Sequence, residues 1–196
     1  MADCYPRIVE TDRLRFEPLY EVDPWEYYRF RRDQPPEVYA YLPFEPPETP
    51  REAADTLADA REDWDGRSRA MYAVRPTGGE DAGELAGETM LATQWENRVA
   101  WLGLILGKRF WGRGYSGERA DAMLEVVFDR LDLEYVAVVH EVGNENSRRA
   151  VERYTGRHGG RREATLRHWS APGADGVPSE AYYAVPRAEW TARRRS

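Results

Sequence analysis

Apolar residues recur along the chain at two different spacings, and each spacing predicts a different kind of element. Across residues 120–131 they follow steps of three and one, which is the stripe of an amphipathic helix. Residues 53–64 carry a similar stripe, which is preceded by the helix-start pair Thr49-Pro50 and followed by the helix stop Gly66. We therefore expect a helix in each of these two regions.

Short apolar or alternating runs predict the strands. Residues 99–106 are almost entirely apolar, which is typical of a strand buried on both faces. The other predicted strands cover residues 10–19, which run into a loop, and residues 71–74, 84–92, 135–139, 164–169 and 181–185. The last two would form a closing hairpin around the turn-rich residues 171–179.

Three further segments complete the predicted fold. Trp25 lies in a mixed helical stretch with an aromatic face, and the proline-rich residues 41–50 predict a rigid loop. Residues 143–154 predict a capped helix. The chain shows no repeat of fixed period and no linker, so we expect one domain over residues 1–196. Its class would be α/β (α+β), with a mixed sheet flanked by helices.

Composition narrows the class of protein. The chain has 196 residues, 41% of them hydrophobic, which is enough for one core. Its formal net charge of −7 argues against nucleic acid or an anionic membrane as a partner, although arginines cluster at 148–149, 161–162 and 193–195. Cys4 is the only cysteine, which excludes an intrachain disulfide and a Cys-based zinc cluster. No apolar run approaches the roughly 20 residues that cross a bilayer. We expect a cytoplasmic protein without a metal.

The most informative motif is a glycine-rich loop that follows the buried strand. Gly112, Gly114 and Gly117 spell G-x-G-x-x-G where the strand turns into a helix. Such a loop can present unpaired backbone N–H groups to a phosphate, or it can be an ordinary strand-to-helix turn. A nicotinamide-binding Rossmann domain would place it after the first strand, with several βα units following. Here it comes after residue 100 and only one further parallel unit follows, which disfavours that interpretation.

The order of the motifs is more specific than any one of them. Arg109, Gly112 and Gly114 match the pattern Gln/Arg-x-x-Gly-x-Gly/Ala, and one helix and one strand later Asn144 and Ser147 match Asn-x-x-Ser. In this order the chain resembles the GCN5-related N-acetyltransferases (GNAT) over nearly its whole length. The segments TDRLRFEPL, WGRGYSGE and YYAVPRAEW are similar to the RimJ/RimL group, which acetylates protein N-termini, and to its small-amine relatives.

The resemblance implies an acyl-CoA-dependent N-acyltransferase. Such an enzyme would move an acetyl group from acetyl-CoA directly to a primary amine, on a protein N-terminus or a small molecule. Two strands, Val99–Leu106 and Tyr135–Glu141, would splay apart and hold the pantetheine arm between them. The residues implied to bind the cofactor are Leu104, Ile105, Leu106, Arg109, Gly112, Arg113, Gly114, Tyr115, Ser116, Gly117, Asn144 and Ser147.

The catalytic residues follow less directly from the resemblance. Ser147 could protonate the leaving thiolate, although it is also a favoured helix-cap residue. The tyrosine acid of many relatives is Val151 here, and Trp101 replaces a common strand carboxylate. The base must come from elsewhere, and we select Glu141 from four candidates, which are Glu88, Glu96, His140 and Glu141. A non-catalytic acyl-CoA-binding module is the alternative that these departures motivate.

The amine acceptor would bind beside the splayed strands, among aromatic side chains. Trp25, Tyr41, Phe44 and Trp101 are the candidates, although aromatic clusters often only pack a core. The predicted strand at residues 181–185 could pair with a second copy of the chain, which would make a homodimer. The expected partners are therefore acetyl-CoA and an amine, without nucleic acid or membrane.

Overall fold

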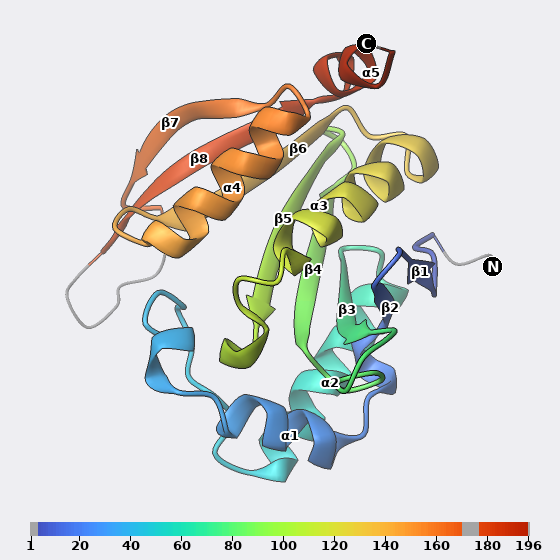
Figure 1. Cartoon of the computed structure of the whole chain (residues 1–196), viewed down its shortest axis with the longest axis vertical. Coiled ribbons are helices and arrows are strands. Elements are labelled where there is room, and N and C mark those ends of the chain that lie inside the picture. The colour runs from blue at the N-terminus through green and yellow to red at the C-terminus, as the bar shows by residue number, and fades with distance from the viewer. Residues whose placement is uncertain (1–3, 170–176, 196) are drawn as a thin grey trace.

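The computed structural model describes residues 4–169 and 177–195, which form one mixed sheet of eight strands with helices around it (Figure 1). The strand order is β1-β2-β3-β4-β5-β6-β8-β7, and β5 and β6 are the one parallel pair of neighbours. This architecture confirms the predicted α/β class with a mixed sheet flanked by helices. The strands are β1 Val9–Glu10, β2 Leu14–Pro18, β3 Arg69–Pro76, β4 Gly87–Gln94, β5 Val99–Leu106, β6 Tyr135–Glu141, β7 Arg161–Arg167 and β8 Ser179–Pro186.

Most helices begin where the sequence supplies a side-chain cap. Asp23 accepts hydrogen bonds from the backbone of Trp25 and Glu26, and Thr49 accepts one from Glu52. The α-helices are α1 Pro24–Arg32, α2 Pro50–Asp65, α3 Tyr115–Glu125, α4 Glu145–Arg157 and α5 Arg187–Arg195, and the shorter turns are η1 Leu19–Glu21, η2 Pro36–Val38, η3 Lys108–Phe110 and the π-helical η4 Val126–Arg130.

Several boundaries differ from those that the apolar pattern predicts. The predicted apolar stripe starts at residue 120, but the helix after the glycine loop begins at Tyr115. Its first turn contains mostly small and polar residues, so the stripe does not mark it. The segment 10–19 is two strands with a bend between them, and the long β3 and β7 extend beyond their apolar centres. Helix α5 is Arg-rich with only Trp190 buried, so periodicity gave no signal for it. Most of the predicted hairpin turn lies outside the described residues.

The sheet opens between its two parallel strands. β5 pairs with β4 along its whole length, from Val99 to Leu106, but with β6 over three residue pairs alone, from Val99↔Tyr135 to Trp101↔Ala137. Beyond this junction β5 and β6 diverge, with α3 and α4 beside the gap (Figure 1). The predicted splay is therefore present, and the second half of β5 has no strand neighbour on its β6 side.

Two groups of buried side chains hold the helices to the sheet. The larger joins α3 and η4 to one face and includes Met123, Phe128 and Tyr72. The smaller joins α1 and α2 to the sheet and includes Tyr27 and Leu57. Tyr72 of β3 belongs to the larger group and its neighbour Ala73 to the smaller, so the two groups cover opposite faces of the sheet.

The proposed dimer edge at residues 181–185 is wrong. These residues belong to β8, which lies between β6 and β7, so both of its edges are already paired. The sequence pattern could not reveal this order, because β8 follows β7 in the chain but precedes it in the sheet. Within the described residues, no helix is long and apolar enough to cross a membrane, and no cluster of ligands suitable for a metal ion is found.

Candidate active site

A cleft of about 1240 Å³ lies at the opening between β5 and β6. It brings together almost all of the predicted cofactor residues, from three elements that are distant in sequence. They are Leu104, Ile105 and Leu106 of β5, Gly112, Gly114, Tyr115, Ser116 and Gly117 around the start of α3, and Asn144 and Ser147 at the start of α4.

The start of α3 is suited to an anion. Gly114 is its N-cap residue with φ of 83°, and no side chain caps the helix, in contrast to α1, α2 and α4. Gly112 also has positive φ, 76°, and a Cβ there would meet no atom within 4 Å. Backbone N–H groups without a side-chain acceptor, at the positive end of a helix dipole, bind phosphate groups in many proteins. The loop therefore fits the pyrophosphate of an acyl-CoA.

Arg109 and Arg113 lie beside this loop and do not line the cleft. Arg113 Nη1 is 2.5 Å from the Asp81 carboxylate, and Arg109 forms ion pairs with Glu84 and, at 3.5 Å, with Asp81. Both side chains are about half exposed. Their direct role in binding a phosphate stays a prediction, because each would first have to leave a carboxylate.

The loop is anchored to the N-terminal part of the chain. Arg13 lies just before β2, and its Nη1 donates a hydrogen bond of 3.0 Å to the carbonyl of Arg113. Its Nε donates to Glu118 on α3 at 2.7 Å. Partial burial tends to raise the pKa of Glu118, but hydrogen bonds from the Thr11 hydroxyl and from Arg13 outweigh it and hold that pKa below its usual range.

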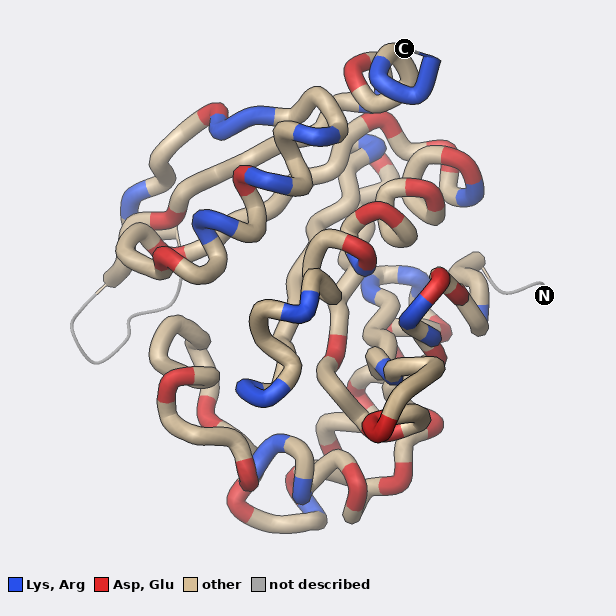
Figure 2. Tube along the Cα trace, viewed as in Figure 1, with Lys and Arg blue, Asp and Glu red and all other residues tan. Residues whose placement is uncertain are grey.

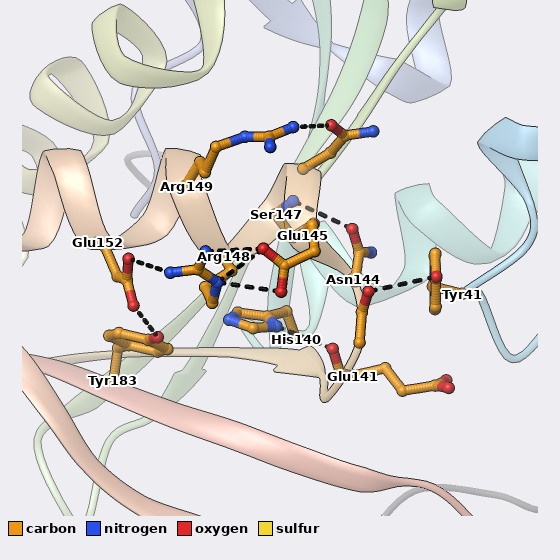
Figure 3. A network of polar contacts seen from close by, with 12 residues as sticks. Tyr41, His140, Glu141, Asn144, Glu145, Ser147, Arg148, Arg149, Glu152 and Tyr183 are labelled. Atoms are coloured by element: carbon orange, nitrogen blue, oxygen red, sulfur yellow. Dashed lines mark hydrogen bonds and ion pairs between the residues drawn. The ribbon is translucent and has the colours of Figure 1, made fainter.

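At the start of α4, Asn144 and Ser147 combine a structural role with a place in the cleft. Asn144 Oδ1 accepts a hydrogen bond of 3.0 Å from the backbone N–H of Ser147, which caps the helix (Figure 3). The Ser147 hydroxyl forms no hydrogen bond to any other described residue. It is thus available to a molecule in the cleft, while Asn144 supplies the cap.

The candidate bases at the end of β6 point to opposite faces of the sheet. His140 is buried, and its Nδ1 lies 2.9 Å from the carbonyl of Glu141, an acceptor, so that nitrogen carries the proton. Its Nε2 has no partner among the described residues. Glu141 does not line the cleft, and its carboxylate points away from Ser147, on the side of the strand near the loop of Tyr41 (Figure 3). Glu141 as a base stays a prediction.

The predicted acceptor residues do not form one group. Tyr41 lines the cleft and donates a hydrogen bond of 3.3 Å to the carbonyl of Gly143. Phe44 lines a second pocket of about 590 Å³, between α1, α2 and the sheet. Trp25 is an exposed residue of α1, and Trp101 packs against Trp169 and Tyr182 on the far side of the β5–β6 junction. Neither tryptophan lines the cleft or the second pocket.

Helix α4 contributes basic residues that the motif comparison missed. Arg149, Arg153 and Arg157 line the cleft. Arg157 is 2.5 Å from Asp121, and Arg149 donates to the side-chain oxygen of Asn146, whereas Arg153 is exposed and forms no ion pair within the described part of the chain. These three arginines follow Asn-x-x-Ser at intervals of four residues, which places them on one face of the helix. This spacing in the sequence could have indicated a basic face beside the cofactor.

Two pairs of polar side chains are buried beside the sheet. On β4, Glu88 Oε1 accepts a hydrogen bond of 2.6 Å from Arg31 of α1, and burial raises the pKa of Glu88 in spite of this partner. Below the cleft, Arg119 of α3 lies over the ring of Tyr154 at 5.7 Å, and burial lowers the pKa of Arg119. The Tyr154 hydroxyl is buried without a hydrogen-bond partner among the described residues.

Comparison with known families agrees with this geometry. The model of the acetyltransferase (GNAT) domain matches residues 13–156, which include the splayed strands, the glycine loop and both helices of the cleft. The chain belongs to the GNAT acetyltransferase family. Members of this family use acetyl-CoA.

Several solved structures are similar to this GNAT protein over nearly its whole length. A protein of T. thermophilus, provisionally assigned as an acetyltransferase, is 26% identical with a TM-score of 0.77, covering 97% of this chain and 95% of that one. A GCN5-related N-acetyltransferase from Brucella melitensis is 23% identical with a TM-score of 0.80, covering 99% and 86%. Spermidine N-acetyltransferase from Vibrio cholerae, solved with CoA and spermine, is 16% identical with a TM-score of 0.73, covering 92% and 99%. The last two likenesses show a shared fold.

A curated relative has a closer sequence. The uncharacterised protein YkkB of Bacillus subtilis strain 168 is 32% identical over 113 residues, which is 56% of this chain. The match spans 63% of the length of that relative. The name of that relative states neither an activity nor an acceptor.

Proposed function

We propose that this GNAT protein is an N-acetyltransferase that transfers the acetyl group of acetyl-CoA directly to a primary amine, and that residues 1–196 form one catalytic domain. The observation that carries the proposal is the β5–β6 junction of three residue pairs, which opens into a cleft ending at the uncapped start of α3. An extended acyl-CoA needs both features, a free strand edge for its amides and an anion site for its pyrophosphate.

The described residues divide the binding of acetyl-CoA between them. Backbone groups of Leu104–Leu106 would pair with the pantetheine amides, and one N–H would polarise the thioester carbonyl. Backbone N–H groups from Gly112 to Gly117 would receive the pyrophosphate. Arg149 and Arg153 line the same cleft and would supply positive charge to the phosphates.

Acetyl-CoA supplies a thioester whose carbonyl carbon the neutral amine attacks, so that a C–N bond replaces the C–S bond, the amine nitrogen loses one proton and the thiolate gains one. Ser147 would donate that last proton, and Glu141, which does not line the cleft, would receive the amine proton through water. Solvent would then take the proton from Glu141 and return one to Ser147. Positioning of the amine by the cleft would contribute most of the rate. Cys4 does not line the cleft, which supports direct transfer without an acyl-cysteine.

We further propose that the protein is cytoplasmic and that it is closest in function to the RimJ/RimL group or to its small-amine relatives. The supporting observations are the single cysteine, the net charge of −7 and the segments that resemble that group. A protein N-terminus and a small amine both remain within this proposal. A homodimer, if formed, would use β7, which is the edge strand at this end of the sheet.

The decisive experiment combines binding with turnover. Acetyl-CoA, but not NAD, should raise the melting temperature of the protein in a concentration-dependent way. A panel of primary amines should then release free CoA thiol from acetyl-CoA. Thermal stabilisation without thiol release from any amine or N-terminal peptide would instead support an acyl-CoA-binding module. No shift with acetyl-CoA would contradict the proposal, and a shift with NAD would favour a dinucleotide site.

A further inference from the structure

The second pocket, between α1, α2 and the loop of residues 44–48, is strongly acidic. Leu19, Met71 and Phe44 form apolar parts of its wall. Figure 2 shows acidic positions along this loop and α2, away from the basic positions of α4. Six carboxylates line the pocket, and they belong to Glu45, Glu48, Glu52, Asp55, Asp59 and Glu88.

One of the two basic residues of the pocket neutralises Glu88, and the other neutralises none of the remaining five carboxylates. Arg31 is held by Glu88 at 2.6 Å, and Arg69 is bound to Asp63, which lies outside the pocket, with Nε 2.9 Å from its carboxylate. At the rim, Glu45, Glu48 and Asp59 form no ion pair within residues 4–169 and 177–195. The negative field in the pocket is therefore unbalanced.

A buried acceptor atom lies on the inner wall of the second pocket. Glu88 is 3% exposed, and although its Oε1 is bound to Arg31, its Oε2 has no hydrogen-bond partner among the described residues. A buried carboxylate oxygen without a donor is costly, and an ammonium or amine N–H would satisfy it. The adjacent ring of Phe44 already lies against a cation, the Arg31 guanidinium, whose Cζ is 5.1 Å from the ring centroid.

The second pocket lies next to the cleft. Glu88 is the strand partner of Ile105, which lines the cleft, so their side chains share one face of the sheet. The same loop borders both spaces, with Tyr41 and Leu42 in the cleft and Phe44 and Glu45 in the second pocket. A flexible molecule in the second pocket could therefore extend one end towards the β5 edge where the thioester would lie.

We infer that the second pocket binds the acceptor and that the acceptor is an aliphatic diamine or polyamine. This inference rests on the proposed function and names its substrate class. One nitrogen reacts as the neutral amine and loses its proton on forming the amide. The remaining ammonium groups stay charged, and Glu88 with the rim carboxylates holds them. A monoamine of equal length lacks this second attachment and would bind more weakly.

The inference is tested by comparing 1,4-diaminobutane with butylamine as acceptors, with CoA thiol release as the readout. The wild-type protein should have a much lower KM for the diamine, and this KM should rise with salt. Asp55→Asn/Asp59→Asn should raise the diamine KM about threefold to tenfold, since the rim carboxylates are partly solvated. The KM for butylamine should change little. Glu62→Gln, an exposed carboxylate of α2 outside the pocket, is the matched control and should leave both values unchanged.

Glu88→Gln tests the buried end of the second pocket and should raise the diamine KM at least about tenfold, since a charge-assisted bond is lost from a desolvated site. If that variant does not fold, the rim variant decides. Equal KM values for the diamine and butylamine, or an unchanged diamine KM in the rim variant, would overturn the inference while leaving acetyl transfer intact. Failure of the proposed function would appear differently, as absence of thiol release with every amine.

Discussion

Arg13, just before β2, and Glu118, in the first turn of α3, are joined by two hydrogen bonds and one further ion-pair contact. The backbone N–H, Nε and Nη2 of Arg13 lie 2.9, 2.7 and 2.6 Å from the carboxylate oxygens of Glu118. Since Arg13 also donates to the carbonyl of Arg113, one side chain connects the N-terminal strand to the glycine loop. The geometry of the anion site therefore depends on a contact between segments about a hundred residues apart.

Loss of this contact should destabilise the protein in a pH-dependent way. Glu118→Gln should lower the free energy of unfolding at pH 7 by about 1 kcal/mol, because the bonds are charge-assisted but Arg13 is half exposed. The folded-state pKa of Glu118 is lowered, so its contribution is fully present above the unfolded pKa of about 4.3 and is lost as pH falls through the folded value. Denaturation at several pH values should show the two proteins converging below pH ~4. A constant difference would mean that the charge is not involved.

Gly114 and Gly117 look alike in the sequence, but alanine substitutions at the two positions should have different effects on stability and on acetyl-CoA binding. Gly114→Ala forces a residue with φ of 83° to carry a Cβ, which would also lie 3.3 Å from Arg13 Nη2, so we expect a loss of about 1 kcal/mol in stability and weaker acetyl-CoA binding. Gly117→Ala places its Cβ 3.5 Å from the flexible end of Arg157, inside a helix, and should be neutral or stabilising. Calorimetric binding and melting temperature measure both. Equal effects of the two variants would contradict an anion site at Gly114.

Substitutions of Ser147 and Asn144 should separate a loss of catalysis from a loss of helix capping. Ser147→Ala should reduce kcat for acetyl transfer by about tenfold or more, with little change in stability, because its hydroxyl forms no bond in the protein. Asn144→Ala should cost about 1 kcal/mol in stability, because it removes the 3.0 Å cap bond to the Ser147 backbone. Asn144→Asp keeps the cap and is the control for that loss. An unchanged kcat in Ser147→Ala would remove Ser147 from the proposed chemistry.

The basic residues of α4 that line the cleft should affect activity through the binding of acetyl-CoA. Arg153→Gln should raise the KM for acetyl-CoA about threefold to tenfold and reduce its dependence on salt, because Arg153 lines the cleft without an ion pair in the described structure. Arg148 is the matched control on the same helix, since it is bound to Glu145 and Glu152 and lies outside the cleft. Steady-state kinetics at low and high salt make the comparison. A similar change in Arg148→Gln would indicate a general effect of charge.

The free energy of unfolding should fall far more when one member of the buried pair of Arg31 and Glu88 is removed than when both are removed. Arg31→Met should lower the free energy of unfolding by about 3 to 5 kcal/mol, because it leaves a carboxylate buried without its cation. Arg31→Met/Glu88→Met should recover much of that loss, because no charge is then buried. Urea denaturation of the single and double variants measures the coupling. Additive losses would show that the pair is not coupled.

Much of the cofactor half of the site could be predicted from sequence, because it depends on local chemistry. Gly112 and Gly114 adopt the positive φ values that glycine favours, and Asn144 caps the helix that it precedes. These features need only a few neighbouring residues. Their order along the chain was sufficient to indicate the family that the comparison then showed.

The acceptor half could not be predicted in the same way. The aromatic pattern predicts Trp25 and Trp101 beside the acceptor, yet Trp25 is exposed on α1 and Trp101 packs against Trp169. Arg31 and Glu88 are 57 residues apart, and neither belongs to a motif, so their pairing at 2.6 Å has no sequence signal.

The sequence by itself determined most of the helices and strands and the glycine loop, since hydrophobic period, caps and glycine conformation are properties of short segments, whereas the splay of the sheet was implied by the family resemblance. The tertiary structure alone decided which charges meet. It placed β8 inside the sheet, turned Arg109 and Arg113 towards Asp81 and Glu84, and gathered six carboxylates, including that of Glu88, around one pocket. Coulombic interactions and desolvation depend on distance in space and on burial, and these exist only after the distant segments have packed together.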